Sequence, residues 1–225
     1  MKKAFTLFEI VVVIIVIGIM AAFVAPKFSR DDLRLAADQI AAHIRYTQHL
    51  AMIDDKYDPG NADWYRGRWQ IYFINEVNGQ EQANYAIFSD QKSQKTNKYD
   101  GNPNKDEIAK NPSNSSQHLI SEHAGISGIK PTPEVGLKEK YNIKSTALNG
   151  GCGKSGSTRI FFDELGRPYS GNLQNSNGKP SIKSPYQNIM TEQCNITLTH
   201  KNGSKCTINV EPETGYVTIR DCGSN

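Results

Sequence analysis

Uncharged apolar residues fill the chain between Ile10 and Ala25, and the hydrophobic run begins at Phe5. As an α-helix at about 1.5 Å per residue, the segment 5–25 spans about 31 Å, roughly the thickness of a bilayer core. A cleaved signal peptide has a shorter apolar core followed by a small-residue cleavage site. The pattern therefore predicts a helix that crosses a membrane once, where the carboxylate of Glu9 is costly.

After Pro26 the pattern changes to that of an amphipathic helix. Proline removes a helical hydrogen bond and predicts a kink where the chain leaves the membrane. Asp31 and Asp32 place negative charge in a first turn, where the helix dipole favours it. From there to about Ile53, apolar residues recur at spacings of three and four: Leu33, Ala36, Ala37, Ile40, Ala41, Ile44 and Ala51. This stripe predicts a helix that packs on a sheet of its own domain.

The remainder of the chain contains several strand patterns. Segments 69–74 and 84–88 combine aromatic and β-branched residues around an Asn-Gly turn, which predicts a β-hairpin. A short strand followed by a turn is expected at 157–162. The segment 194–220 alternates between polar and apolar residues in three runs, which predicts a three-stranded meander. The expected fold is therefore α+β, with a long N-terminal helix, half membrane-embedded and half amphipathic, packed on an antiparallel sheet.

A polar tract with little periodicity covers about 90–140 and is rich in Asn, Ser and Lys. Such a segment is either a surface loop or partly disordered, and it is where partner specificity is expected. Within it, oxygen-bearing side chains alternate as they do in calcium loops: Asp100, Asn102, Asn104 and Asp106. However, Lys105 stands where such a loop has glycine, and Asn111 where it has a bidentate glutamate. A solvated loop without a cofactor is favoured, and a calcium site is the alternative.

Four cysteines lie in the last third of the chain: Cys152, Cys194, Cys206 and Cys222. No pair has the C-x-x-C spacing of a zinc or redox site. An even number beyond a membrane anchor indicates two disulfides in an oxidising compartment. Four cysteines allow three pairings. The hairpin around 212–215 favours Cys206 with Cys222, which leaves Cys152 for Cys194, and these bonds would staple the C-terminal meander.

Charge and hydropathy exclude two classes of protein. A mean hydropathy of −0.56 excludes a protein that spans the membrane many times. The net charge of +3 includes Lys2 and Lys3, so the remaining chain carries only +1. A body so close to neutral argues against a nucleic-acid partner. The lysines that could form a DNA surface are then interpreted as a solvated face: Lys179, Lys183, Lys201 and Lys205.

The pattern of reactive residues does not indicate an enzyme. The five histidines are scattered, no serine has the glycine pattern of a nucleophile elbow, and apart from the calcium alternative no cluster has the spacing of metal ligands. His43 and His49 fall on the flanks of the amphipathic helix, where we expect them to be solvated.

The first residues of the chain resemble a known leader sequence. Lys2, Lys3 and Ala4 precede the sequence Phe-Thr-Leu-Phe-Glu, which ends at Glu9. This motif resembles the class III leader of type IV pilins and type II secretion pseudopilins, and the resemblance covers about the first 26 residues. In that family a membrane-embedded prepilin peptidase cuts before the phenylalanine and methylates the new amine. The resemblance implies cleavage between Ala4 and Phe5 and N-methylation of Phe5.

The same resemblance implies assembly roles for three residues. Glu9 falls where the family keeps its glutamate, and Gly18 and Pro26 fall where many members soften the helix. Neither the Glu9 carboxylate nor the new N-terminal amine is stable alone in lipid, so pairing between subunits would set the stagger of a filament. The alternative is that the carboxylate snorkels to the bilayer rim. Ala4 and Phe8 depart from the family, which usually has glycine and an aliphatic residue there.

These features predict a leader peptide at 1–4, a transmembrane and assembly helix at 5–26, and a pilin-like globular domain at 27–225. The resemblance implies a structural subunit rather than an enzyme, held in the bacterial inner membrane by a single span, with its C-terminal domain in the periplasm or in a filament outside the cell. Its partners would be prepilin peptidase, other pilins or pseudopilins, the inner-membrane assembly platform and membrane lipid.

The pathway that the filament serves is open between several candidates. A helix with Arg45 and Ala51 near its end, followed by a strand that opens at Trp69, is similar to the H-type minor pseudopilins. This favours a minor subunit of a type II secretion pseudopilus or a type IV pilus. The alternatives are a subunit of a DNA-uptake pseudopilus, or an unprocessed signal-anchored protein that binds an exported ligand through the 90–140 tract.

Overall fold

The computed structural model describes residues 6–24, 31–77, 79–153, 157–173 and 182–223. Contacts divide the chain into two units, one that ends at Asp31 and one that begins at Asp32.

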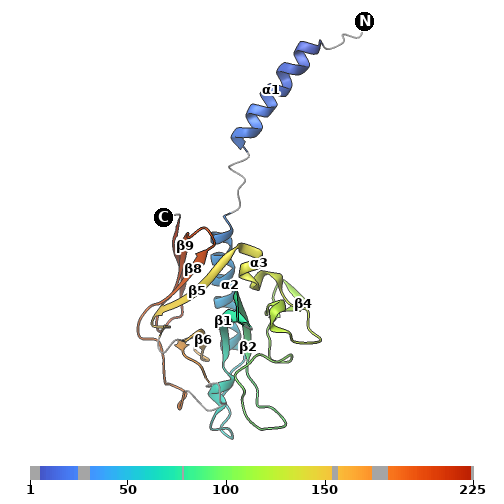
Figure 1. The fold of residues 1–225 in the computed structure, drawn as a ribbon. Coiled ribbons are helices and arrows are strands. Elements are labelled where there is room, and N and C mark those ends of the chain that lie inside the picture. The colour runs from blue at the N-terminus through green and yellow to red at the C-terminus, as the bar shows by residue number, and fades with distance from the viewer. Residues whose placement is uncertain (1–5, 25–30, 78, 154–156, 174–181, 224–225) are drawn as a thin grey trace. The chain divides into compact units, whose positions relative to one another are not determined.

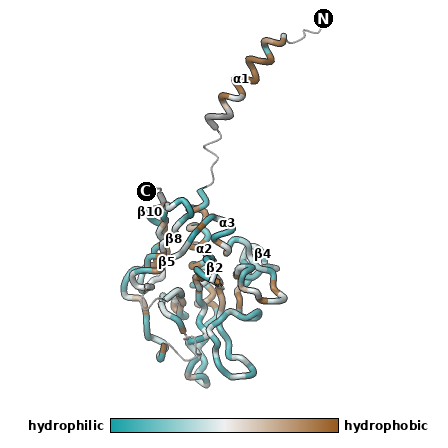
Figure 2. Tube along the Cα trace, in the orientation of Figure 1, coloured by the Kyte–Doolittle hydropathy of each residue, from teal (hydrophilic) through white to brown (hydrophobic). Residues whose placement is uncertain are grey.

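The first unit contains helix α1 (Leu7–Val24). Large apolar side chains from Leu7 to Met20 are exposed, and Figure 2 colours most of this part of the helix as hydrophobic. Glu9 lies in the first turn. Among the residues that the structure describes, no helix combines the length and hydropathy needed to cross a membrane.

The predicted amphipathic helix forms as α2 (Asp32–Ile53). Every residue of the predicted stripe is buried: Leu33, Ala36, Ala37, Ile40, Ala41, Ile44 and Ala51. Thr47 fills the gap in this stripe, and its hydroxyl donates a 2.8 Å hydrogen bond to the carbonyl oxygen of His43. The threonine is therefore buried without an unsatisfied donor. The predictions of this helix and of its buried face are confirmed.

The second unit contains two four-stranded antiparallel sheets (Figure 1). The first has the order β2-β1-β6-β7, formed by β1 (Trp69–Val77), β2 (Gln80–Ser89), β6 (Arg159–Phe162) and β7 (Pro168–Ser170). The second has the order β10-β9-β8-β5, formed by β5 (Ile143–Gly150), β8 (Cys194–His200), β9 (Lys205–Val210) and β10 (Val217–Gly223). The predicted hairpin and meander are confirmed, whereas the sequence pattern did not indicate β5.

One hydrophobic core connects α2 with both sheets. Helix α2 contacts β1 and β6 of the first sheet and β8, β9 and β10 of the second. Alternate residues of the strands enter this core, such as Ile71 and Phe73 on β1 and Ile196 and Leu198 on β8. The apolar residues that recur every second position in the strands therefore pack against those that recur every three to four positions in α2.

The 90–140 tract forms more structure than its polar composition indicated. It contains two short strands, two 3₁₀ turns and the start of a short helix: β3 (Lys110–Asn111), β4 (Asn114–His118), η3 (Glu122–Ala124), η4 (Pro133–Val135) and α3 (Leu137–Tyr141). Val135 and Leu137 are fully buried in the main core. The tract is thus a structural part of the second unit rather than only a surface loop.

Two apolar pairs of this tract bind to the outer edge of β2. The amide of Ile87 donates to the carbonyl oxygen of Leu119 at 3.0 Å, and the amide of Ala109 donates to the carbonyl oxygen of Ile87 at 2.9 Å. Ile108 and Ile120 pack beside them in a separate apolar cluster. Each apolar pair is flanked by polar residues, so the sequence has neither helical nor strand periodicity here.

His43 is buried, contrary to the expectation that it is solvated, whereas His49 is exposed as expected. Nδ1 of His43 lies 2.7 Å from the hydroxyl oxygen of Tyr85, and Nε2 lies 3.0 Å from the amide nitrogen of Gln39. His43 is one turn from Ile40, so it lies on the buried face of α2. Burial lowers the pKa of His43 to about 4, and the ring is therefore neutral at pH 7.

Replacement of Ile40, which is fully buried in α2, should destabilise the second unit. Ile40→Ala should lower the free energy of unfolding by about 2–5 kcal/mol, because it leaves a cavity between the helix and the sheets. Leu35→Ala is the control in the same helix, since Leu35 is 42% exposed; it should cost about 1 kcal/mol or less. Urea unfolding measures both values, and equal losses would contradict the assigned buried face.

The stability of the fold should fall in mild acid because of His43. Its pKa of about 4 in the folded chain lies below the ordinary value of 6.5, so between these values the unfolded chain binds more protons. The contribution of neutral His43 to the free energy of unfolding is complete above pH 6.5. About 3 kcal/mol of this free energy is lost as the pH falls to 4. Unfolding measured across this range should have a shallower pH dependence for His43→Gln, whereas exposed His49→Gln should keep the wild-type slope. Parallel slopes for the two variants would refute the assignment.

Candidate functional site

The N-terminal motif is only partly covered by the structure. Thr6, Glu9 and Gly18 are described, whereas the predicted cleavage and methylation residues, Ala4 and Phe5, and the predicted kink residue, Pro26, lie outside the described residues.

Thr6 and Glu9 bind each other at the start of α1. The Glu9 carboxylate accepts hydrogen bonds from the amide of Thr6 at 3.1 Å and from its hydroxyl at 3.2 Å. The amide of Glu9 lies 3.3 Å from the hydroxyl oxygen of Thr6. This reciprocal arrangement is a capping box, in which a threonine and a glutamate three residues later satisfy free amides of the first helical turn. The sequence Thr-Leu-Phe-Glu fits this motif as well as the leader motif, an interpretation that sequence reasoning missed.

Among the described residues, none packs against Gly18 in a way that accounts for its lack of a side chain. A Cβ atom added at this position would have no neighbour within 4 Å. A glycine inside a helix costs about 1 kcal/mol relative to alanine. It leaves a small surface on α1 that another helix could approach closely.

The four cysteines form two disulfides, Cys152–Cys194 and Cys206–Cys222. These are the pairs that the hairpin spacing favoured. The first bond joins the turn after β5 to the start of β8, beside a close backbone approach. A Cβ at Gly150 would lie 2.3 Å from the carbonyl oxygen of Gln193, and Gly150 also has a positive φ of 64°. Only glycine therefore fits next to this disulfide.

The calcium candidates lie in a loop that its own hydrogen bonds close. They are Asp100, Asn102, Asn104 and Asp106. The Asp100 carboxylate accepts from the Asn102 amide at 2.8 Å and from the Asn104 side chain at 3.1 Å. Glu107 accepts from the amides of Asn104 and Gln91, and burial raises its pKa. Nowhere in the described residues do three His, Cys, Asp or Glu side chains come close enough to hold a metal ion.

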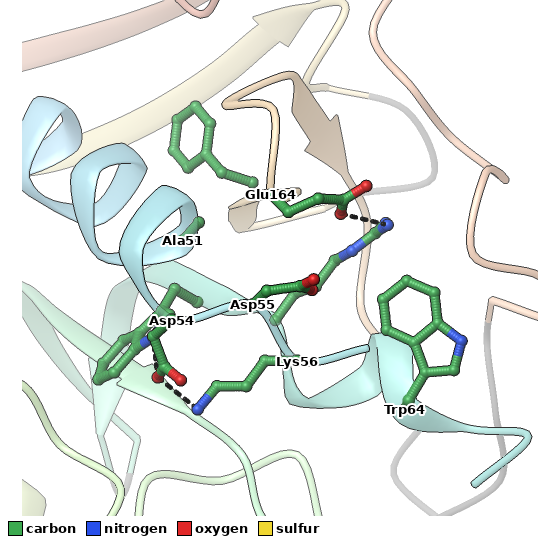
Figure 3. A pocket seen from close by; sticks show the side chains of 9 residues that line it. Ala51, Asp54, Asp55, Lys56, Trp64 and Glu164 are labelled. Atoms are coloured by element: carbon green, nitrogen blue, oxygen red, sulfur yellow. Dashed lines mark hydrogen bonds and ion pairs between the residues drawn. The ribbon is translucent and has the colours of Figure 1, made fainter. Parts of the chain in front are cut away.

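A pocket lies where α2 ends and the chain continues to η2 (Trp64–Gly67) and β1 (Figure 3). Its described lining contains charged residues of both signs: Asp54, Asp55, Lys56, Arg68 and Glu164. Asp54 pairs with the Lys56 ammonium, and its Oδ2 also accepts a 2.8 Å hydrogen bond from the indole of Trp69. The described lining has no serine, cysteine or histidine. Two of its carboxylates are ion-paired, Asp54 with Lys56 and Glu164 with Arg68, and the described lining does not place a serine or cysteine nucleophile beside a histidine base.

Arg68 is buried between aromatic rings beside this pocket. Its guanidinium carbon lies 5.0 Å from the ring centre of Trp64 and 4.8 Å from that of Tyr169. Nη1 donates a 2.6 Å hydrogen bond to the carbonyl oxygen of Pro185, and Nη2 lies 3.7 Å from a carboxylate oxygen of Glu164. Because these partners come from different segments, Arg68 holds the end of η2 against β7 and the chain around 185.

Two further arginines are buried, and the sequence analysis missed all three. Arg66 lies 5.3 Å from the ring centre of Tyr99, and Arg159 lies 4.0 Å from that of Tyr72. Burial lowers the pKa of Arg159. The available signal was the alternation of arginine with aromatic residues in Trp-Tyr-Arg-Gly-Arg-Trp, which favours stacked cations.

A second cavity lies between η3, η4 and α3. The residues that line it are Ser121, Glu122, His123, Thr132, Pro133, Gly136 and Glu139. Nε2 of His123 lies 3.8 Å from a carboxylate oxygen of Glu139, and both side chains are more than a third exposed. An exposed pair of this kind contributes little energy. The geometry does not bring these groups into a catalytic arrangement.

Comparison of the chain with family models, curated proteins and solved structures finds no match in any of the three.

Arg68→Lys tests the structural role assigned to this guanidinium. Lysine keeps the charge but cannot stack on Trp64 and reach the Pro185 carbonyl with a planar group, so we expect a loss of about 1–3 kcal/mol in the free energy of unfolding. Arg34→Lys is the control, because Arg34 forms an exposed ion pair with Asp38. Thermal or urea unfolding should show almost no change for the control. A loss no larger than that of Arg34→Lys would contradict the role of Arg68.

Proposed function

We propose that this protein is a pilin-like structural subunit, processed at Phe5 by a prepilin peptidase and assembled through α1 into a filament at the bacterial inner membrane. The observation that carries the proposal is the position of Glu9. It is the one ionisable residue of α1, Leu7–Val24, and it lies in the first turn of an otherwise apolar helix.

The composition of α1 supports assembly in an apolar environment. A helix that is hydrophobic on all sides is not suited to packing one face against a globular core, and it needs lipid or other helices around it. Gly18 adds a place on α1 where a second helix could come close without a steric clash. We propose that an assembly platform extracts these helices from lipid and that helix–helix contacts replace the lipid contacts.

The charge on Glu9 supports a fixed register between subunits. Cleavage before Phe5 would leave a charged amine four residues from Glu9. An isolated charge in an apolar environment is unfavourable, so an amine of one subunit and a Glu9 carboxylate of another are stabilised when they meet. Only certain axial offsets between helices allow this contact, and the offset would then repeat along the filament.

The second unit is suited to the periplasm or to the filament surface. Its two disulfides are typical of oxidising compartments. Helix α2 is long, and its stripe is fully used by the core, so the unit does not depend on α1 for its packing. We propose a minor subunit of a type II secretion pseudopilus or a type IV pilus, and deletion phenotypes in secretion and motility distinguish the two.

The mass of the chain from its native membranes tests the processing step. The proposal requires a chain that begins at Phe5 and carries one added methyl group, identified by intact mass and an N-terminal peptide map. A chain that keeps Met1 or Lys2 through Ala4 would refute processing and favour a signal-anchored binding protein.

Two matched variants separate assembly from helix capping. Glu9→Ala should reduce filament incorporation at least tenfold, on the basis that an unpaired amine would remain in an apolar interface, at a cost of more than about 1.4 kcal/mol. Thr6→Ala removes the capping partner but keeps the carboxylate, so it should cost the helix about 1 kcal/mol and leave assembly largely intact. Incorporation is measured from sheared or cross-linked filaments. Equal defects in both variants would mean that Glu9 acts only as a cap.

A further inference from the structure

Exposed lysines gather at the end of the second unit where α2 begins. The side-chain amide of Asn142 donates to the Asp32 carboxylate at 3.4 Å, and the amide of Lys201 donates to the Asn142 carbonyl oxygen at 2.9 Å. The first turn of α2, the start of β5 and the β8–β9 turn therefore lie together, and the ribbon shows them at one end of this unit (Figure 1). Three lysines on these segments form what we call the lysine end: Lys144, Lys201 and Lys205.

The lysine end presents exposed ammonium groups, and the carboxylates of Asp32 on α2 and Asp221 on β10 lie on the same or neighbouring segments. Lys144, Lys201 and Lys205 are exposed, and within the described residues none of them forms an ion pair. The ammonium of Lys201 donates to the side-chain oxygen of Asn142 at 3.2 Å, a neutral acceptor. Arg220 adds a fourth exposed cation on β10, which pairs with β9 beside Lys205.

The chemistry of this end fits a charged surface rather than an apolar groove. Leu35, in the first turn of α2, is the one large exposed apolar side chain that the described residues place on these segments. The other large apolar side chains that are exposed on the second unit lie elsewhere: Met52, Ile53, Tyr57, Leu165, Tyr186 and Tyr216. None of them belongs to the β8–β9 turn or to the start of β5. A partner would therefore be held by its negative charge and not by hydrophobic contact.

We infer that the lysine end docks on the anionic headgroups of the membrane that anchors the chain. This inference rests on the proposed function, because it requires α1 to be in lipid. Asp32 follows the end of α1 by only eight residues, so the end of the second unit that begins α2 is the part nearest to the anchor along the chain. Each lysine near an anionic bilayer strengthens binding about fivefold. Docking would hold the subunit against the membrane until assembly removes it.

Duplex DNA is the other polyanion that this end could bind, and the observations favour it less. Of the four lysines considered for a DNA surface, Lys179 lies outside the described residues. Lys183 follows Ile182, whose carbonyl oxygen accepts a 3.0 Å hydrogen bond from Tyr65 in η2. Lys183 therefore lies near the C-terminal end of α2, while Lys201 and Lys205 lie near its N-terminal end, about 30 Å away along a 22-residue helix. These lysines do not form one continuous patch for a duplex.

Hydrogen exchange of the full chain in lipid nanodiscs tests the docking. Amides at 142–145 and 201–205 should exchange at least tenfold more slowly in discs that contain phosphatidylglycerol than in discs of phosphatidylcholine alone. The difference should disappear in about 1 M salt, where charges are screened beyond about 3 Å. It should also disappear in Lys144→Gln/Lys201→Gln/Lys205→Gln.

Lys95→Gln/Lys98→Gln/Lys183→Gln is the matched control. It removes the same charge from exposed lysines near Tyr99 and Ile182, at the opposite end of α2, so it should keep the protection in anionic discs. Equal exchange in the two kinds of disc, or equal loss of protection in both triple variants, would overturn the inference. Protection by added duplex DNA but not by anionic lipid would assign the lysine end to nucleic acid.

The two proposals fail in different ways in the same experiment. A chain that enters both kinds of disc without lipid-dependent protection refutes only the docking. A chain that enters neither kind of disc refutes the membrane anchor, and the docking falls with it.

Discussion

The close packing of α2 against both sheets is the constraint on which the second unit depends. Three alanines, Ala36, Ala37 and Ala41, allow the strands to approach the helix, and Ile40 and Ile44 fill the space between them. A larger residue at an alanine position would force the sheets apart, and a smaller one at an isoleucine would leave a void. The sizes of these side chains therefore set both the smallest and the largest distance at which α2 and the strands can pack.

Polar side chains on α2 also bind the turns that join strands within the two sheets. The side-chain nitrogen of Gln48 donates hydrogen bonds of 2.8 Å to the carbonyl oxygens of Gly166 and Thr214, which lie in the β6–β7 and β9–β10 turns. Arg45 donates to the Val217 carbonyl oxygen at 2.9 Å. Arg68 and Arg159 also hold neighbouring segments together. Each guanidinium stacks on an aromatic ring and donates a hydrogen bond to a backbone carbonyl oxygen.

The sequence predicted those parts of the fold that have a regular hydrophobic period. The stripe on α2, the β1–β2 hairpin and the C-terminal meander have such periods, and each forms where it was expected. Strand β5 was missed because few of its residues are buried. His43 was misplaced because its burial depends on Tyr85, which is distant in sequence. Of the candidate assembly site, the motif predicted the position of Glu9 in a helix but not its bond to Thr6, which follows from local helix capping rather than from the resemblance.

The cover over the β2 edge has a consequence for how copies of this protein can associate. An open strand edge pairs readily with any other extended chain. In this protein the amide and the carbonyl group of Ile87 already form hydrogen bonds with Leu119 and Ala109 of the same molecule. A strand of another molecule therefore cannot pair with β2 at Ile87. The 90–140 tract, although it has the composition of a loop, protects this edge against aggregation through strand pairing.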